Sequence, residues 1–298
     1  MFLRYNLLDD YGFNHVRQTW KEYFLSIFAF MINFPLDVYY IFRVQMYIYY
    51  LGNYKKENIF SPLSKESNQN PHIISQKETN RGKIVCWNIQ YGNAIFKLDT
   101  IDEMINFLVQ ENPEIVVLQE ILKNNKINQI ELLTQKLGFS HSYFQENIDL
   151  QNLKLGNLIL SNKPINILKS VRQYQIVEVE RNDKKLIICN VHFPSDLTCI
   201  KQKKLISNLI LDIQKVKTEN ADSEFLITGD FNLLSWSKEI KDLQSTVNLL
   251  PNRQYTFPSN YPLVKYDYVF HHGFQTEPIL DIRDITLSDH TPMVIQLS

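Results

Sequence analysis

From about residue 82 to its C-terminal end, the chain alternates short runs of aliphatic and β-branched residues with amphipathic helical stretches. This alternation is typical of an α/β domain, in which helices cover a core of β-strands. Apolar residues recur at helical spacing over residues 101–109 and 205–216. The strand-like runs are residues 83–87, 114–118, 158–160, 185–189, 225–228, 266–270 and 293–297. The pattern therefore predicts one α/β domain over residues 82–298.

Residues 1–53 differ from this domain, because apolar and aromatic side chains dominate their second half. The apolar run at 24–34 is shorter than the about 20 residues that a membrane-spanning helix needs, and the run at 38–51 is interrupted by polar residues. Three interpretations stay open: helices lying in a membrane interface, helices packed on the catalytic domain or a partner, and a true span or hairpin. The polar residues 54–81 that follow predict a linker.

A membrane surface is one partner that this apolar N-terminal segment predicts, through residues 20–51. Tyrosine and tryptophan side chains with flanking lysines are typical of a membrane interface. The segment does not match a secretory signal, since its apolar run begins only after Arg17, Lys21 and Glu22. We therefore expect an intracellular protein with peripheral membrane attachment.

The charge balance gives no electrostatic footprint for nucleic acid. The 298 residues include 31 basic and 32 acidic side chains, for a formal net charge of −1. Subtracting the 8 basic and 7 acidic residues of 1–80 leaves 23 and 25 for the predicted catalytic domain, a net charge of about −2. Proteins that hold duplex DNA through its phosphates normally have a basic face. Hydrolysis of DNA is therefore not favoured by electrostatics.

Three cysteines, Cys86, Cys189 and Cys199, are too few and too unevenly spaced for a disulfide framework in a chain of this length. Cys86 and Cys189 lie within apolar strand-like runs. We expect them to be buried free thiols in a reducing compartment.

Polar side chains stand where several of the predicted strands end, and they are the most informative residues of the chain. A carboxylate or imidazole beside an apolar strand costs free energy unless it is paired or binds a ligand. Taken singly, each has an ordinary explanation as a turn residue, a helix-start acid or a loop histidine. Together they predict one polar site at the edge of the sheet core. They are Asn88, Glu120, Asn157, His192, Asp230, Asn232, Asp267, Asp289 and His290.

These residue types suit the attack of water on a phosphate ester. That reaction needs a base beside the water and stabilisation of the charge that develops on the phosphoryl and leaving oxygens. A hard cation such as Mg²⁺ takes carboxylate and amide oxygens and needs only one or two acids from the protein. The sequence contains no HExxH or CxxC motif for zinc, no GxSxG nucleophile elbow and no glycine-rich phosphate loop.

The order of the motifs resembles that of the endonuclease/exonuclease/phosphatase superfamily, which includes deoxyribonuclease I-like nucleases, abasic-site endonucleases, neutral sphingomyelinases and inositol-polyphosphate 5-phosphatases. The resemblance covers residues 83–297 and implies a four-layer α/β/β/α sandwich of the deoxyribonuclease I type, here with an extra apolar N-terminal helical segment. The motifs are Trp87-Asn, Gln119-Glu, Gly156-Asn-Leu-Ile-Leu-Ser161, Asn190-Val-His, Gly229-Asp-Phe-Asn, Tyr266-Asp-Tyr-Val-Phe and Ser288-Asp-His.

The resemblance also implies a magnesium site, for which Mn²⁺ could substitute. Glu120 would be the principal ligand, Asn88 would lie beside it, and Asp289 would contribute directly or through water. One departure is Gln90, which stands where abasic-site endonucleases carry a further acid. This difference weakens the assignment to DNA repair.

The remaining implied roles concern the reaction itself. Asp230 would position or deprotonate the attacking water, and Asn232 would hold that water and a phosphoryl oxygen. His290, oriented by Asp267, would contact the scissile phosphate. His192 would stabilise the pentacovalent state or assist the leaving group. The division of acid and base duties between the two histidines stays open.

The resemblance implies a phosphate ester as the substrate, either a phospholipid head group or nucleic acid, and Asn157 would line its binding site. The apolar N-terminal segment favours a phosphodiesterase at a membrane. Three alternatives stay open: an endonuclease acting on DNA or RNA, a phosphomonoesterase acting on a phosphoinositide or nucleotide, and an inactive binding module of the same fold. The motifs carry no signal for the oligomeric state.

Overall fold

A computed structural model of the chain describes residues 82–297, except 96, 98, 151–152, 196–199 and 252–253. The predicted N-terminal segment (1–53), the predicted linker (54–81), the predicted membrane surface (20–51) and Cys199 lie outside the described residues. Among the described residues, no helix is both long enough and apolar enough to cross a membrane.

The first of two six-stranded sheets has the strand order β11-β12-β1-β2-β4-β3. Within it β1 and β2 run parallel, and the other neighbouring strands are antiparallel. Its strands are β1 (Lys83–Asn88), β2 (Ile115–Asn124), β3 (His141–Leu150), β4 (Leu153–Ser161), β11 (Ile279–Ile282) and β12 (Met293–Gln296).

The second sheet has the strand order β5-β6-β7-β8-β10-β9. Here β7 and β8 are the parallel pair, and the other neighbours are antiparallel. Its strands are β5 (Ile165–Val171), β6 (Tyr174–Arg181), β7 (Lys184–His192), β8 (Glu224–Asp230), β9 (Asn248–Leu249) and β10 (Asp267–His272).

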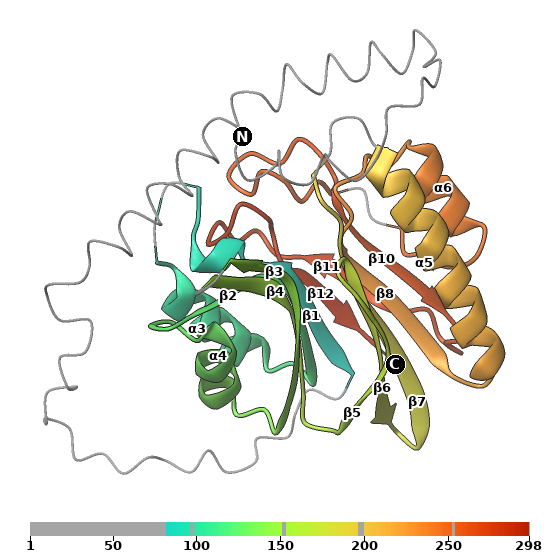
Figure 1. Cartoon of the computed structure of the whole chain (residues 1–298), viewed down its shortest axis with the longest axis horizontal. Coiled ribbons are helices and arrows are strands. Elements are labelled where there is room, and N and C mark those ends of the chain that lie inside the picture. Colours follow the sequence, from blue (N-terminus) through green and yellow to red (C-terminus); the bar gives the residue numbers. More distant parts are fainter. Residues whose placement is uncertain are drawn as a thin grey trace, which may run out of the picture. The chain divides into compact units, whose positions relative to one another are not determined.

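Helices cover the outer face of each sheet, so that the described residues form four layers (Figure 1). The first sheet is flanked by α3 (Ile101–Glu111) and α4 (Gln129–Leu137), and the second by α5 (Ile200–Glu219) and α6 (Lys238–Gln244). A single-turn 3₁₀ helix, η1 (Gln90–Gly92), follows β1. The predicted α/β/β/α sandwich is confirmed.

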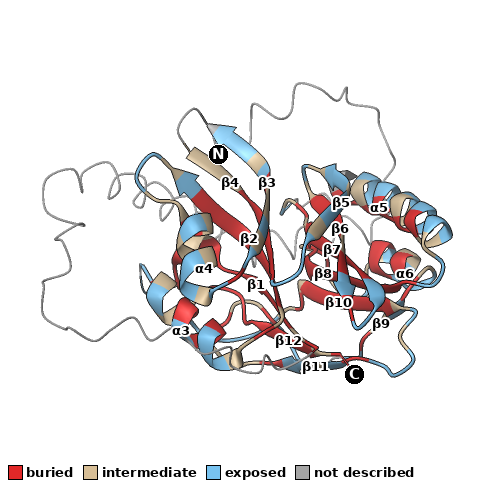
Figure 2. Ribbon diagram, turned by 90° about the horizontal axis from the view of Figure 1, so that it is seen from below, coloured by how far each residue is buried: buried red, intermediate tan, exposed pale blue. Residues whose placement is uncertain are grey.

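Three apolar clusters hold these layers together. One lies between the two sheets and includes Ile84, Val117 and Ile188. The others lie between each sheet and its helices, where the helices turn buried side chains inward and exposed ones outward (Figure 2). Central strands such as β8 are buried along their whole length, which explains their continuous apolar sequence.

The predicted strands and the two predicted helices are all present, with end points shifted by a few residues. Cys86 and Cys189 are buried free thiols, as predicted. Burial raises the pKa of Cys86 to about 12, so this thiol is not reactive at neutral pH. The strands β3, β5, β6, β9 and β11 and the helices α4 and α6 were not predicted.

Candidate active site

The strand pairing brings the predicted site residues to one end of the two sheets. Asn88 is the last residue of β1, and Glu120 lies in the neighbouring β2. His192 and Asp230 end the parallel strands β7 and β8 as register partners, and Asp267 begins β10 directly opposite Asp230. Because parallel strands end at the same sheet edge, side chains far apart in the sequence become neighbours, such as Asn88 and Asp230, which are 142 residues apart.

A bulge in β2 allows two consecutive residues to serve this site. The pairing of β2 with β4 shifts register across Gln119 and Glu120, and Glu120 has a left-handed φ of 58°. In a regular strand the two side chains would point to opposite faces. Here Gln119 donates to Asn190 Oδ1 at 2.7 Å, and Glu120 Oε1 lies 3.6 Å from His192 Nε2, so both reach β7.

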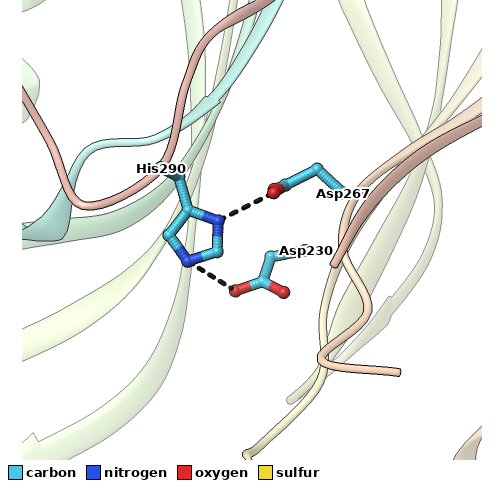
Figure 3. A group of neighbouring side chains, drawn as sticks. All are labelled: Asp230, Asp267 and His290. Carbon is cyan, nitrogen blue, oxygen red and sulfur yellow. Dashed lines mark hydrogen bonds and ion pairs between the residues drawn. The ribbon is translucent and has the colours of Figure 1, made fainter. Parts of the chain in front are cut away.

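His290 lies between two buried carboxylates (Figure 3). Its Nδ1 is 2.7 Å from Asp267 Oδ2, and its Nε2 is 3.6 Å from Asp230 Oδ2. Burial alone would lower the pKa of His290, but the charges of Asp267 and Asp230 outweigh it and hold this pKa well above its usual range. Both ring nitrogens thus face carboxylate oxygens, an arrangement that favours the doubly protonated imidazolium.

Asn232 fixes the carboxylate of Asp230. The Asn232 backbone N–H donates to Asp230 Oδ1 at 2.9 Å, and Asn232 Nδ2 donates to Asp230 Oδ2 at 3.0 Å and to Phe193 O at 2.9 Å. Burial raises the pKa of Asp230, and repulsion from Asp267 adds to this, while His290 opposes it. The structure thus provides a rigidly held carboxylate with a raised proton affinity.

A sequence model described as "Endonuclease/Exonuclease/phosphatase family" matches residues 85–290, more than two thirds of the chain and all of the site residues just placed. The chain belongs to this family. Its members are phosphoester hydrolases that generally depend on a divalent metal. A comparison with curated protein sequences gave no match.

Solved structures of this family share the fold at low sequence identity. An endonuclease/exonuclease/phosphatase from Beutenbergia cavernae DSM 12333 is 18% identical over 72% of this chain and 71% of that chain, with a TM-score of 0.57. Truncated Caenorhabditis elegans TDP2 is 15% identical over 72% of this chain and 97% of that chain, with a TM-score of 0.57. The human Nocturnin catalytic domain, solved with a bound sulfate anion, is 16% identical over 72% of this chain and 92% of that chain, with a TM-score of 0.55. These likenesses establish the fold.

The acidic residues of this family member fit a hard divalent cation. Burial, together with repulsion from Glu120 and Asp230, raises the pKa of Asp289 although His290 opposes the shift. Several buried carboxylates that repel one another are stabilised when a cation binds between them. Asn88 Nδ2 lies 3.1 Å from both Glu120 Oε1 and Asp230 Oδ2. In this orientation Asn88 bridges the two acids, and its oxygen would face a cation only after a rotation of the amide.

Asp230, Asp267 and His290 also lie close enough together to share a metal ion, with their ligand atoms within 4.8 Å of one another. A histidine ligand must be neutral at the coordinating nitrogen. Both ring nitrogens of His290 face carboxylate oxygens of this group, so ion pairs also link its three residues.

The hairpin loop of residues 255–264 holds the segment that carries Asp289 and His290. Thr256 O accepts from Thr291 N at 3.0 Å, Ser259 N donates to Asp289 O at 2.7 Å, and the ring of Phe257 lies 4.9 Å from that of His290. Residue-pattern reasoning missed these contacts, because a threonine or phenylalanine in a loop has no distinctive spacing.

Two further contacts were not predicted. Trp87 Nε1 donates to His290 O at 2.8 Å, which ties β1 to the catalytic histidine. The hydroxyl of Tyr91 bonds to Glu120, and burial followed by the charge of Glu120 raises the pKa of Tyr91 well above its usual value. Tyr91 therefore orients Glu120, the expected metal ligand, although no pattern in the sequence marks Tyr91.

Asn157 lies on β4 directly opposite the β2 bulge, because Leu118 pairs with Leu158 and Ile121 pairs with Gly156. Gln119 and Glu120 of the bulge therefore face Asn157 across the two neighbouring strands. Asn157 is fully buried, and its Oδ1 accepts from Asn147 Nδ2 of β3 at 3.1 Å. Its role as a substrate-binding residue stays a prediction.

Proposed function

We propose that this chain is a metal-dependent phosphodiesterase in which Asp230 acts as the general base. The observation that carries this proposal is the environment of one carboxylate. Asp230 is held by two hydrogen bonds from Asn232, faces the His290 imidazolium and lies 4.0 Å from His192 Nε2. A general base needs a fixed position and a pKa near the working pH, and both conditions are met here.

The proposed reaction is hydrolysis with inversion at phosphorus. Water attacks the phosphorus atom as its proton passes to Asp230, and the bond between phosphorus and the leaving oxygen breaks. His290, kept charged by Asp267, donates a hydrogen bond to a phosphoryl oxygen. His192 has about one fifth of its side chain exposed, which leaves it free to approach the leaving oxygen from the open side. The leaving oxygen takes up a proton from His192 or solvent and departs as an alcohol, and Asp230 returns its proton to solvent. The products are a phosphomonoester and an alcohol, so one water is consumed.

Glu120 and Asp289 would hold Mg²⁺ or Mn²⁺, with Asn88 beside them. When bound, such a cation supplies a Lewis acid that stabilises negative charge on the phosphoryl and leaving oxygens. The chain's own contribution is the orientation of these ligands. Glu120 is fixed by the β2 bulge, by the amide of Asn88 and by Tyr91, and Asp289 is fixed by the contact of its backbone oxygen with Ser259.

Hydrolysis of bis(p-nitrophenyl) phosphate with Mg²⁺ or Mn²⁺ tests this proposal. We expect Asp230→Asn and His290→Gln to lower kcat/KM by about 10²- to 10⁴-fold, which is the usual contribution of a general acid or base. Asp281→Asn is a matched control, because Asp281 is an exposed carboxylate paired with Arg283 at 2.7 Å. Equal rates in the wild type and both site variants would remove the assignment.

A substrate panel separates the remaining possibilities. Plasmid DNA, an abasic oligonucleotide, sphingomyelin and inositol phosphates each present the scissile phosphate in a different setting. Release of inorganic phosphate would identify a phosphomonoesterase, and nicking of plasmid DNA would identify an endonuclease. No turnover of any substrate by a folded, metal-loaded protein would favour a binding module.

Membrane attachment through residues 20–51 is a separate part of the proposal. Its support is the apolar, aromatic composition of that segment. Flotation of the full chain with liposomes, compared with a fragment of residues 82–298, tests it. Equal flotation of the two would reject the role of this segment.

A further inference from the structure

Large apolar side chains are exposed on two loops beside the proposed catalytic carboxylate. We call Trp236, Tyr255, Tyr261 and Leu263 the apolar rim. Each has more than half of its surface exposed, up to 72% for Tyr261. Trp236 follows the end of β8, and the other three lie in the stretch that leads into β10. Such grouping of exposed apolar residues marks an interaction surface more often than single scattered ones do.

The two loops leave the same end of the second sheet and are bonded to each other. Asp230 ends β8 opposite Asp267, the first residue of β10, so the loop after β8 and the loop before β10 start side by side. Phe231 N donates to Tyr266 O at 2.9 Å. The buried hydroxyl of Tyr268 lies 2.8 Å from the backbone oxygen of Leu233 and 2.9 Å from that of Lys265.

The rim is also tied to the catalytic histidine. Tyr255 precedes Thr256, whose backbone oxygen bonds to the residue after His290, and Leu263 N donates to Phe257 O at 2.9 Å. The ring of Phe257 in turn packs on His290. These contacts link the rim to His290, so a surface that touches the rim lies close to the proposed active site.

The composition of the two loops favours a lipid surface over other partners. Residues 231–237 and 254–266 contain no Asp or Glu, in a chain with 32 of them, so neither loop repels an anionic head group. Tyrosine and tryptophan are the residues that settle at a membrane interface, and Leu263 adds an aliphatic anchor. Nucleic acid would require several basic side chains to contact its phosphates, whereas Lys265 is the only basic residue of the two loops.

We infer that the apolar rim sits on the interface of a phospholipid bilayer and presents the active site to phosphodiesters in that bilayer. This inference rests on the proposed function and deepens it by naming the partner surface. It is independent of the N-terminal segment, because the rim belongs to the catalytic domain itself.

Trp236 provides a direct probe in the full chain. The chain has three tryptophans, and replacing Trp20 with phenylalanine leaves Trp87, which is buried, and Trp236. We expect vesicles of phosphatidylcholine and phosphatidylglycerol to shift the emission of Trp236 to shorter wavelength, and brominated acyl chains to quench it. The further substitution Trp236→Phe should remove both effects.

Affinity provides the second readout. We expect Tyr261→Ser together with Leu263→Ser to lower the vesicle partition coefficient by about tenfold or more, since each side chain loses apolar area that the bilayer would cover. Leu211→Ser is the matched control, because Leu211 is equally exposed but lies on α5. Thermal unfolding checks that all variants are folded, which we expect because the replaced side chains are exposed.

Emission of Trp236 that does not respond to vesicles would overturn the inference, as would equal partition coefficients for the rim variant and Leu211→Ser. A response to single-stranded DNA in place of vesicles would overturn it in favour of nucleic acid. These measurements need no turnover. A protein that binds vesicles through the rim but fails to hydrolyse bis(p-nitrophenyl) phosphate would thus refute the proposed function, while the contact of the rim with the bilayer would stand.

Discussion

Replacing Asp267 with asparagine tests the charge state of His290 without any substrate. The substitution keeps the shape of the side chain and removes its charge, at a place where the carboxylate oxygen lies 2.7 Å from His290 Nδ1 and both residues are buried. We expect the free energy of unfolding to fall and the pKa of His290 to fall with it.

The magnitude follows from the kind of hydrogen bond that is lost. A bond between charged groups contributes about 1.5–3 kcal/mol and a neutral one about 0.5–1.5 kcal/mol, so the expected loss is about 1–2 kcal/mol. A shift of one pKa unit corresponds to about 1.4 kcal/mol, so the pKa of His290 should fall by about one unit.

The stability difference between the wild type and Asp267→Asn should depend on pH. The folded pKa of His290 lies above its unfolded value, so the stability from this ion pair is fully present below about pH 6.5 and is lost as the pH rises through the folded pKa. The difference between wild type and Asp267→Asn should therefore be largest in mildly acidic solution. At alkaline pH it should shrink, because His290 is then neutral and the variant also escapes repulsion between Asp267 and Asp230.

Urea unfolding in EDTA at a series of pH values measures this difference, and NMR titration follows the imidazole directly. Glu277→Gln is the matched control, because Glu277 also faces a histidine, His271, at 3.5 Å but is 60% exposed. Exposed ion pairs contribute at most about 1 kcal/mol, so this control should have little effect. A loss for Asp267→Asn that stays constant across the pH series would show that His290 is not held charged, and the role given to it would fail.

Saturating Mg²⁺ should raise the thermal unfolding midpoint of the wild type, as measured by scanning fluorimetry. At a hundredfold excess of Mg²⁺ over its Kd, the stabilisation should be equivalent to about 2.7 kcal/mol. An equal shift of the midpoint in Glu120→Gln would contradict the assignment of Glu120 as a metal ligand. Gly229→Ala should lower the free energy of unfolding, measured in urea, by about 3 kcal/mol or more. The reason is that Gly229 has a φ of 138° and an added Cβ would overlap Val191 O. A loss below about 1 kcal/mol would refute this prediction. Burial lowers the pKa of Lys265 to about 8, so above that pH the unfolded state binds more protons. Relative to Lys265→Met, wild-type stability should therefore rise between pH 8 and 10, and a fall would contradict this reasoning.

Much of this site could be predicted because its residues stand at the ends of buried strands. Asp230 and His192 follow continuous apolar runs, and the parallel pairing of β7 with β8 then makes them neighbours. The fold class could be predicted from the alternation of strand-like runs with amphipathic helical stretches along residues 82–298. The edge strand β5 was not predictable in this way, because its residues are only partly buried and show no continuous apolar run.

Other features were missed for identifiable reasons. The helix α4 carries signals at both ends that sequence reasoning could have used: the side chain of Asn128 caps its start by accepting from Glu131 N, and Gly138 ends it with a φ of 72°. The bulge at Glu120 leaves no such signal, because a left-handed φ in a non-glycine residue depends on tertiary contacts. The contacts of Tyr91 and Phe257 depend on the same kind of tertiary placement.

The space between the two sheets changes character toward the site, and this change explains how a charged cluster can be buried at all. At the far end the facing side chains are aliphatic, such as Val117 and Ile188. Next comes a neutral polar layer, in which Gln119 donates to Asn190 and Asn190 donates to the backbone oxygen of Leu118. Amide dipoles in this layer can solvate the acids beyond it, and they cost less to bury than charges because they bond to one another. The ionic cluster therefore contacts the fixed amide dipoles of this layer and not the hydrocarbon core. This contact keeps Asp230 and His290 oriented and leaves the apolar core intact.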